Sequence, residues 1–576
     1  MAKVFAFSRS SCDGPIFNDV SLMIWRNKYR RRSLYTKSLD HDWLHTVGRV
    51  LQATSSAVTL GEREILQEAI EGLEIVPAGR ILAGAGTTDD VTLVNTFVIG
   101  SIEPKAMETL AALVCSARTM SMGGGIGLDL SRIPPRGVEI GKGTSPGILA
   151  YAELWDQMCR TIVSSDAQRG AMMVVLRCDH PEIEEFIQAK CQKGVLTNLN
   201  ASVLVTDDFL RAKNNGSPWA LQFDGRVHRH VDPQRLWSEM ASAAYVAAEP
   251  GMIFIDRINR YNNLGYCEKI VATNSCAEQP LPEGGSAPLA SINLAALVRY
   301  PFTSSSYLDL DRLRMLARLG VRFLDRVVDQ TRYPDPAQLE QAHMKRRIGL
   351  GIKGLGDALI LLGHRYGSHA SLESLHSWLS AFRDASYRAS IELARERRPF
   401  PLFNAAAFLD RPFIKTLNAE IQDGIRRYGI RNAVINCIAP TGSTALLANN
   451  VSGGIEPVYA HRQRRRVMMP DHSYKEVELK SWSLQRYLDI FPGRVDGPLP
   501  MSFATALDVH HEDHLAVQAA AQRYIDGSIS KTINFAADIE FDAFEQAYEL
   551  ADNLGCKSLS VYRPSAMRGQ ILSSAD

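Results

Sequence analysis

Residues 270–282 read IVATNSCAEQPLP, and they set a carboxamide, a thiol and a carboxylate at alternate positions, Asn274, Cys276 and Glu278. Alternate side chains of an extended loop project the same way, so we expect these three to share one face. Each residue taken singly has an ordinary interpretation. A cysteine often packs as a small apolar residue, a glutamate is usually solvated, and an asparagine often forms a turn. The sequence around the loop must therefore decide its meaning.

Short apolar runs and helical stretches alternate on both sides of this loop. The apolar runs are 91–99, 126–130, 201–205 and 252–255, and helical spacing is found at 148–164 and 183–190. This alternation predicts an α/β architecture with parallel strands. We expect one dominant domain over residues 76–570, with a helical insertion at about 306–398. An N-terminal helical region, residues 1–75, precedes it.

Two further loops are candidates for backbone contact or anion binding. Gly123-Gly-Gly-Ile-Gly127 lacks the glycine order of a dinucleotide site, so tight backbone packing is favoured. Residues 439–444, Ala-Pro-Thr-Gly-Ser-Thr, follow an apolar run at 433–438 and precede a helix-forming run at 445–448. A strand, a hydroxyl-rich turn and a helix can bind phosphate through free N–H groups. A plain helix cap explains the same residues equally well.

The composition is that of an ordinary globular protein, with 45% hydrophobic and 22% charged residues. A net charge of +1 argues against a broad nucleic-acid or membrane surface, and we expect the basic cluster 462–466 to lie in an exposed turn. The nine cysteines show no metal-ligand spacing, which predicts reduced thiols and no metal site. No apolar run is long enough to cross a bilayer, so we expect a cytoplasmic protein.

The motifs along the chain, taken in order, resemble the catalytic subunit of ribonucleotide reductases, specifically its adenosylcobalamin-dependent (class II) branch. The segments that carry the resemblance are PAGRILAGAG (77–86), GGGIGLDLSRIPPRG (123–137), QRGAMMVVLRCDHPEIEEFIQAK (168–190), EPGMIFIDRINRYNNLGYCE (249–268), TNSCAEQPLP (273–282), SINLA (291–295), KRRIGLGIKGLGDAL (345–359), IAPTGSTALLANNVSGGIEPV (438–458), YIDGSISKTIN (524–534) and GCKSLSVYRP (555–564). The resemblance covers nearly the whole chain. It implies a ten-stranded α/β barrel with a central finger loop, surrounded by N-terminal and peripheral helices.

The resemblance also implies a role for each residue of the triplet. Cys276 becomes the thiyl radical that takes hydrogen from C3′ of a ribonucleotide. Glu278 becomes the general base on the 3′-hydroxyl, and Asn274 holds the hydroxyls by hydrogen bonding. The implied binding partners are a ribonucleotide substrate, a nucleotide effector and a second copy of the chain.

Two other segments take binding roles by the same resemblance. The substrate phosphate is implied to lie in a cradle formed by Thr441, Gly442, Ser443 and Thr444. Gln168 and Arg169 are implied to belong to the loop that relays effector identity to the substrate base. Pro104 stands near a usual effector-contacting acidic residue, which puts the ordinary control of specificity in doubt.

The chain departs from the family at the two cysteines that normally supply electrons beneath the substrate. Thr96 and Ala287 stand at the corresponding positions, and a hydroxyl and a methyl group cannot deliver the two electrons of a dithiol. A C-terminal cysteine pair is likewise expected to be missing, because Cys556 is the last thiol. Within the triplet, Ser275 and Ala277 replace the usual proline and glycine. The triplet itself is retained, which predicts a radical site without its internal reductant.

The radical source follows from the branch of the family. No glycyl-radical motif and no tyrosine pair for radical relay is evident, which leaves adenosylcobalamin as the implied cofactor. Three functions stay open. The first is 2′-deoxygenation of a ribonucleotide with an external reductant such as formate. The second is redox-neutral radical isomerisation, epimerisation or elimination of a nucleotide. The third is a silent nucleotide-binding paralogue, against which the intact triplet counts.

Overall fold

The computed structural model describes residues 17–31, 40–54, 60–141, 143–162, 171–468, 474–494, 497–564 and 572–574. The expected specificity residues Gln168 and Arg169 lie outside the described residues. No helix of the described part is both long and apolar enough to span a membrane.

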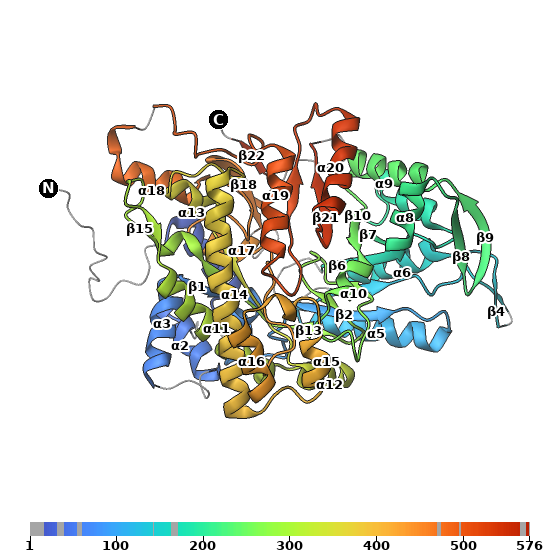
Figure 1. Ribbon diagram of the computed structural model, residues 1–576, viewed down its shortest axis with the longest axis horizontal. Coiled ribbons are helices and arrows are strands. Elements are labelled where there is room, and N and C mark those ends of the chain that lie inside the picture. Colours follow the sequence, from blue (N-terminus) through green and yellow to red (C-terminus); the bar gives the residue numbers. More distant parts are fainter. Residues whose placement is uncertain are drawn as a thin grey trace.

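An eight-stranded sheet forms one half of the molecule (Figure 1). Its strands, in spatial order, are β13 (Ser286–Ala287), β2 (Thr96–Ser101), β3 (Gly125–Asp129), β6 (Met172–Arg177), β7 (Asn200–Val205), β10 (Gly251–Phe254), β21 (Ser558–Tyr562) and β20 (Thr532–Asn534). The neighbours from β2 to β10 are all parallel, whereas β13 on β2 and β21 on β10 are antiparallel. The expected α/β architecture with parallel strands is confirmed.

Helices cover this sheet and bury large aromatic side chains against it. They are α5 (Ala106–Ser121), α6 (Ile148–Thr161), α7 (Ile183–Gln188), α8 (Asp207–Asn215), α9 (Pro233–Ala247), α10 (Ile255–Arg260), α19 (His511–Gln522) and α20 (Phe541–Asn553). Trp155 of α6, Trp237 of α9 and Tyr548 of α20 are fully buried in one hydrophobic cluster with the strand residues. Burial of aromatic side chains of this size is a main source of stability in such a layer.

A second, three-stranded sheet consists of β1 (Ile75–Pro77), β14 (Leu289–Asn293) and β17 (Gly349–Lys353). β1 is antiparallel to β14, and β14 is parallel to β17. The run 433–438, which we expected to be a regular strand, continues this sheet only through isolated parallel bridges, Leu350 to Asn436 and Ile438 to Ile529. Asp526 is one reason, because its carboxylate accepts the backbone N–H groups of residues 435 and 436 that a strand ladder would use.

The N-terminal helices pack on this second sheet. They are α1 (Asp19–Ile24), the π-helix η1 (Trp25–Tyr29), α2 (Trp43–Thr54), α3 (Leu60–Glu71) and α4 (Gly79–Gly84). Val47 of α2 and Ile352 of β17 belong to one hydrophobic cluster, together with residues of α11 (Leu310–Gln330) and α14 (His369–Arg397). The stretch 306–398 contains α11, α12 (Pro336–Lys345), α13 (Leu355–Leu361) and α14, but also β17, so it supplies a strand to the sheet as well as helices.

The remaining elements lie around these two sheets. They are β4 (Glu139–Ile140), β5 (Gly143–Thr144), β8 (Trp219–Phe223), β9 (Arg226–Val231), β15 (Val298–Arg299), β16 (Tyr307–Leu308), α15 (Ala405–Leu409), α16 (Ala419–Tyr428), α17 (Gly442–Leu447), α18 (Trp482–Ile490), and the short 3-10 helices η2 (Ala189–Cys191), η3 (Leu294–Leu297), η4 (Ile414–Thr416) and η5 (Pro492–Arg494).

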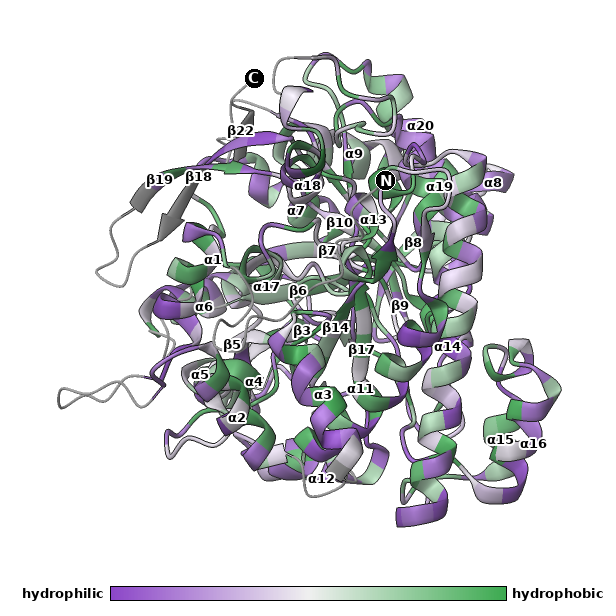
Figure 2. Cartoon of the chain, turned by 90° about the vertical axis from the view of Figure 1, so that its left-hand side faces the viewer, coloured by the Kyte–Doolittle hydropathy of each residue, from purple (hydrophilic) through white to green (hydrophobic). Residues whose placement is uncertain are grey.

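The basic cluster 462–466 does not lie in a turn, and that expectation is wrong. It belongs to β18 (Arg462–Met468), which pairs with β19 (Tyr474–Lys480) and β22 (Leu572–Ser574) in a separate three-stranded sheet (Figure 2). On β19, Glu476 and Glu478 stand opposite Arg466 and Arg464. Arg464 and Glu478 form an ion pair of 3.9 Å across the two strands, and opposite-charge pairs of this kind favour the pairing.

The loop between the two sheets is a small hairpin that lies against the eight-stranded sheet. β11 (Ala272–Thr273) and β12 (Pro280–Leu281) are its antiparallel arms, and β11 packs on β2, β3 and β6. A Cβ atom placed on Gly127 would lie 1.8 Å from the carbonyl oxygen of Thr273. Only glycine allows this approach, so the tight packing expected of Gly123–Gly127 is confirmed. The contact fixes the base of the hairpin 272–281, which we call the finger.

Candidate active site

A cavity of about 260 Å³ lies where the finger loop meets both sheets. It is lined by Asn274, Ser275, Cys276 and Glu278 of the finger, by Asn95, Thr96 and Gly123–Gly125 on the side of the eight-stranded sheet, by Leu289–Ser291, Gly349 and Gly351 of the second sheet, and by Cys437 and Ala439–Thr444. Lys28, Tyr29, Ala78, Gly79, Arg80, Met120 and Ala171 complete the lining. The triplet and the hydroxyl-rich loop, more than 160 residues apart in sequence, therefore share one cavity.

The triplet lies in a tight turn, and the expectation of an extended loop is wrong. The backbone N–H of Ala277 donates to the carbonyl of Asn274 (3.1 Å), and Ala277 has a φ of 64°. The side-chain oxygen of Asn274 accepts the N–H of Gln279 at 3.0 Å. Asn274 thus has the turn-forming role that its residue type favours while also lining the cavity. The turn, and not strand alternation, brings the three side chains to the same place.

Cys276 faces the cavity as an intact thiol. Burial raises its pKa to about 12, and the nearby charge of Glu278 acts in the same direction. The Ser275 hydroxyl lies 3.7 Å from its sulfur. A thiol that keeps its hydrogen at neutral pH is poorly suited to nucleophilic attack, which requires the thiolate. It is suited to giving up and receiving a hydrogen atom.

Glu278 is a buried carboxyl group with one oxygen atom available to a ligand. Its side chain is 3% exposed, and Oε2 has no hydrogen-bond partner within the described part of the chain. Burial raises its pKa to about 7, against the opposing effect of a hydrogen bond from Asn274. A carboxyl group that titrates near neutrality and has a free oxygen can exchange a proton with a ligand hydroxyl in the cavity.

The hydroxyl-rich loop begins at Thr441, which is in the left-handed conformation with a φ of 56°. Its carbonyl accepts the N–H of Ala445 (2.7 Å) and the hydroxyl of Thr444 (3.0 Å), and its own hydroxyl accepts the N–H of Gly454 (3.2 Å). Gly442 and Ser443 are the first residues of α17, so the helix expected from residue 445 begins three residues earlier. This network holds the loop rigidly at the rim of the cavity.

Two lysines reach this loop, and sequence reasoning found neither. Lys28 of η1 donates to the Ser443 hydroxyl at 3.0 Å, and Lys353 at the end of β17 donates to the Thr444 hydroxyl at 2.8 Å. Lys353 could have been suspected, because it is the one charged residue in the otherwise apolar stretch 348–353. Nothing in the local sequence marks Lys28.

Helix α1 anchors η1, and with it Lys28, to the segment around α17. The backbone N–H of Asn18 donates to the side-chain oxygen of Asn449 (2.9 Å), and the Ser21 hydroxyl donates to the carbonyl of Leu446 (2.7 Å). The first described residues of the chain thereby form part of the cavity wall.

Comparison with known proteins gives a family match over most of the chain. Residues 97–562 match the family model described as "Ribonucleotide reductase, barrel domain". The chain is 33% identical over 525 residues to a vitamin B12-dependent ribonucleoside-diphosphate reductase of Mycobacterium tuberculosis (strain CDC 1551 / Oshkosh), a match that covers 88% of this chain and 72% of the relative. It is 31% identical over 528 residues to a protein of the same description from Thermoplasma acidophilum, covering 88% of this chain and 66% of that one.

The chain belongs to the ribonucleotide reductase family. It is an enzyme similar to the vitamin B12-dependent reductases. A more distant relative, the ribonucleoside-diphosphate reductase subunit alpha of Chlamydia pneumoniae, is 24% identical over 77% of this chain.

Thr96 and Ala287, the two positions at which we expected the cysteine pair of the family to be missing, lie opposite each other. Ala287 of β13 is the register partner of Thr96 of β2, and the Thr96 hydroxyl donates to the Ala287 carbonyl at 2.8 Å. Directly opposed residues of an antiparallel pair have Cβ atoms about 4.5–5.5 Å apart, close to disulfide reach. Thr96 lines the cavity, and Ala287 is fully buried.

A second thiol, which the sequence analysis did not single out, also lines the cavity. Cys437 is 1% exposed, and burial, together with the charge of Glu278, raises its pKa well above that of an ordinary cysteine. Cys276 and Cys437 are the only thiols among the described lining residues.

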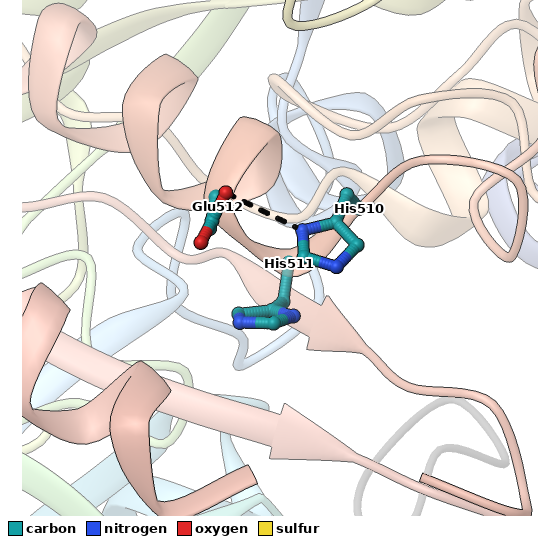
Figure 3. A group of neighbouring side chains, drawn as sticks. All are labelled: His510, His511 and Glu512. Carbon is teal, nitrogen blue, oxygen red and sulfur yellow. Dashed lines mark ion pairs between the residues drawn. The ribbon is translucent and has the colours of Figure 1, made fainter. Parts of the chain in front are cut away.

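One group of side chains among the described residues could hold a metal ion, and it is not part of this cavity. His510, His511 and Glu512 at the start of α19 each offer a ligand atom, all within 4.8 Å of one another (Figure 3). His510 Nδ1 and Glu512 Oε2 lie 3.6 Å apart. Because these residues are consecutive and two of them are exposed, they do not enclose an ion.

Proposed function

We propose that this enzyme acts on a ribonucleotide in the cavity, with Cys276 as the thiyl radical that removes hydrogen from C3′. Glu278 takes the proton of the 3′-hydroxyl, and Asn274 holds the hydroxyls. The observation that carries the proposal is the single cavity lined both by these three side chains and by residues 441–444. It allows a ribose to lie over the finger while its phosphate lies in the loop.

The phosphate cradle and the barrel belong to the same proposal. We assign Thr441, Gly442, Ser443 and Thr444 to the substrate phosphate, and Gln168 and Arg169 to the relay of effector identity. We infer that ten strands, drawn from the eight-stranded sheet, the three-stranded sheet and the bridged segments, close into a barrel within residues 76–570. The position of the finger hairpin against β2, β3 and β6 supports this arrangement.

Adenosylcobalamin fits the chemistry of the thiol. Cys276 retains its hydrogen at neutral pH and faces the cavity, and Gly123–Gly125 add no side chains of their own to the adjoining wall. When bound, the cofactor would supply the radical by homolysis of its cobalt–carbon bond. The chain's own residues then hold the ribose, exclude water and hold the proton of the 3′-hydroxyl.

The proposed net reaction is 2′-deoxygenation with an external two-electron reductant. Loss of the 2′-hydroxyl as water consumes two electrons, and a dithiol would normally give them as it becomes a disulfide. Thr96 and Ala287 cannot, so formate, which becomes carbon dioxide, or an external dithiol is the proposed donor. The absence of cysteines at positions 96 and 287 also favours the alternative. This is a redox-neutral isomerisation, epimerisation or elimination in which Cys276 returns the hydrogen.

Exposed apolar side chains support a homodimer. Met107, Leu110 and Val114 lie on one face of α5 and are 77%, 51% and 66% exposed, and Leu154 of the contacting helix α6 is 41% exposed. A contiguous apolar face of this kind on a soluble domain indicates a protein interface. Two copies related by a twofold axis could bury it in a bundle of four helices.

The test uses the full chain with adenosylcobalamin and each of the four ribonucleoside diphosphates. We expect exchange of tritium from C3′ into water, and we expect Cys276→Ser to abolish it. Dithiothreitol or formate is then supplied and the product identified by mass spectrometry. A deoxynucleotide supports reduction, and an isomer or a released base supports the neutral alternative. Wild-type protein that exchanges no tritium with any nucleotide refutes both and favours a silent paralogue.

A further inference from the structure

Lys353 differs from the other buried lysines of the described chain in having neither a carboxylate nor a backbone carbonyl as partner. Its side chain is fully buried, and its amino group has one hydrogen-bond partner, the Thr444 hydroxyl at 2.8 Å. By contrast, Lys531 pairs with Glu456 (2.5 Å) and Lys345 with Glu268 (2.8 Å). Lys213 also pairs with a carboxylate, and Lys557 donates to the carbonyls of Asp526 and Gly527. An ammonium group buried without a counterion is costly, so a residue of this kind needs an explanation.

Within the described part of the chain, no carboxylate pairs with Lys353. Its register partner on β14 is Asn293, and neither η3 nor α17 carries a charged residue. The nearest carboxyl along the chain, Asp357, accepts the N–H groups of Ser452 (2.6 Å) and Ser483 (2.9 Å). On α11, which also packs on β17, the buried charges Arg322 and Asp325 are paired with Glu396 and Arg346. Burial lowers the pKa of Lys353 well below that of an ordinary lysine.

A second amino group approaches the same loop. Lys28 lines the cavity and donates to the Ser443 hydroxyl at 3.0 Å. Two consecutive hydroxyl residues therefore each accept a hydrogen bond from a lysine. The Thr444 hydroxyl gives its own hydrogen to the Thr441 carbonyl, whereas the Ser443 hydroxyl has no acceptor recorded for its hydrogen within the described residues. The loop is thus supported by two lysine amino groups and retains a donor for a ligand.

We propose that Lys353 is the buried charge partner of the substrate's phosphates, positioning them through Thr444, and that with Lys28 it selects a ligand carrying a diphosphate. This inference rests on the proposed function, since it assigns the anion to the substrate. The two amino groups on one loop, both charged once an anion is bound, match the two or more negative charges of a diphosphate. An uncharged nucleoside would leave Lys28 uncompensated and would give Lys353 no anion to favour its charged form.

A consequence is that binding and protonation are coupled. In the empty cavity, burial disfavours the charged form of Lys353, and a phosphate close to Thr444 favours it. Binding of a diphosphate at neutral pH should therefore take up a proton. A lysine with a purely structural role would show no such coupling.

The test is calorimetric titration of the full chain at pH 7 with inorganic pyrophosphate and with the four ribonucleoside diphosphates, in two buffers of different ionisation enthalpy. We expect wild type to take up between a half and one proton. Lys353→Met should abolish this uptake and weaken binding at least tenfold, with a melting temperature equal to or above that of wild type. Lys28→Met should weaken binding but leave the uptake in place. As a matched control, Lys345→Met should lower the melting temperature, because it leaves Glu268 short of a partner.

The outcomes separate this inference from the proposed function. If wild type binds the diphosphates and Lys353→Met binds them within twofold with the same proton uptake, the inference is overturned and the proposed function stands. A lowered melting temperature of Lys353→Met also overturns it, because the lysine would then be structural. If Lys353→Met loses pyrophosphate binding but wild type turns over no ribonucleotide, the inference stands and the proposed function fails.

Discussion

Glu278 illustrates how a functional residue can lower the stability of the protein that contains it. Its pKa of about 7, against an ordinary 4.5, means that the folded state holds the proton more tightly than the unfolded state. This stabilising effect is fully present below about pH 4.5 and is lost as pH rises through 7. At higher pH the ionised carboxylate costs roughly 3 kcal/mol.

Replacement of Glu278 by glutamine should therefore stabilise the protein and inactivate it. At pH 8 we expect Glu278→Gln to unfold with a free energy up to about 3 kcal/mol higher than wild type, and at pH 4.5 with nearly the same value. Denaturant unfolding at the two pH values measures this difference. The exposed Glu153→Gln is the control and should change stability by less than ~0.5 kcal/mol at either pH. Equal stability of Glu278→Gln and wild type at pH 8 would contradict the assignment.

The rate of C3′ tritium exchange should rise with pH in wild type as Glu278 ionises, with a midpoint near 7. The physical reason is that only the carboxylate can take the proton of the 3′-hydroxyl. A profile that is flat from pH 6 to 8 would mean that another group is the base.

Among the elements, the strands beside the finger hairpin could be predicted from the sequence, whereas the turn within the hairpin could not. The residue pattern predicted the strands near 125–129, 200–205 and 251–254, because short apolar runs bounded by glycine carry that signal. It did not predict the turn at the triplet, because the Asn274 side chain and the unusual φ of Ala277 overrode the extended spacing. The amino groups that reach the hydroxyl-rich loop belong to Lys28 of η1 and Lys353 of β17. No local sequence pattern can show that segments so far apart in the chain meet at this loop.

The register of β2 and β13 leads to a prediction for these two strands. Thr96→Cys combined with Ala287→Cys should give the cavity an internal dithiol, since the two positions are directly opposed. With dithiothreitol, this double variant should form deoxynucleotide at least tenfold faster than wild type. Chromatography of the products after a fixed time measures the gain.

Each single cysteine variant is a matched control and should show no gain, because one thiol cannot close the disulfide. Oxidation of the double variant without substrate should also remove two hydrogens in its mass spectrum. A disulfide that forms without any deoxynucleotide would favour the redox-neutral alternative.

At the scale of the whole molecule, the exposed face of α5 predicts association in solution. We expect wild type to have the mass of a dimer by light scattering, and Met107→Glu combined with Val114→Glu to have that of a monomer. Two buried carboxylates facing their symmetry copies would be desolvated and repelled. Leu554→Glu, at an exposed position immediately after α20, should leave the dimer intact. A wild-type monomer at micromolar concentration would refute the proposed interface.

The anchoring of α1 has a consequence for how the protein is made. Asn18, Ser21 and Lys28 find their partners 415 to 431 residues further along the chain. A ribosome releases the amino end first, so this opening helix must remain undocked until residues near 450 have emerged. Contacts of such long range also slow folding after release. Removal of residues 17–28 therefore acts directly on the wall of the cavity, whereas a nascent chain halted before residue 440 has no complete cavity at all.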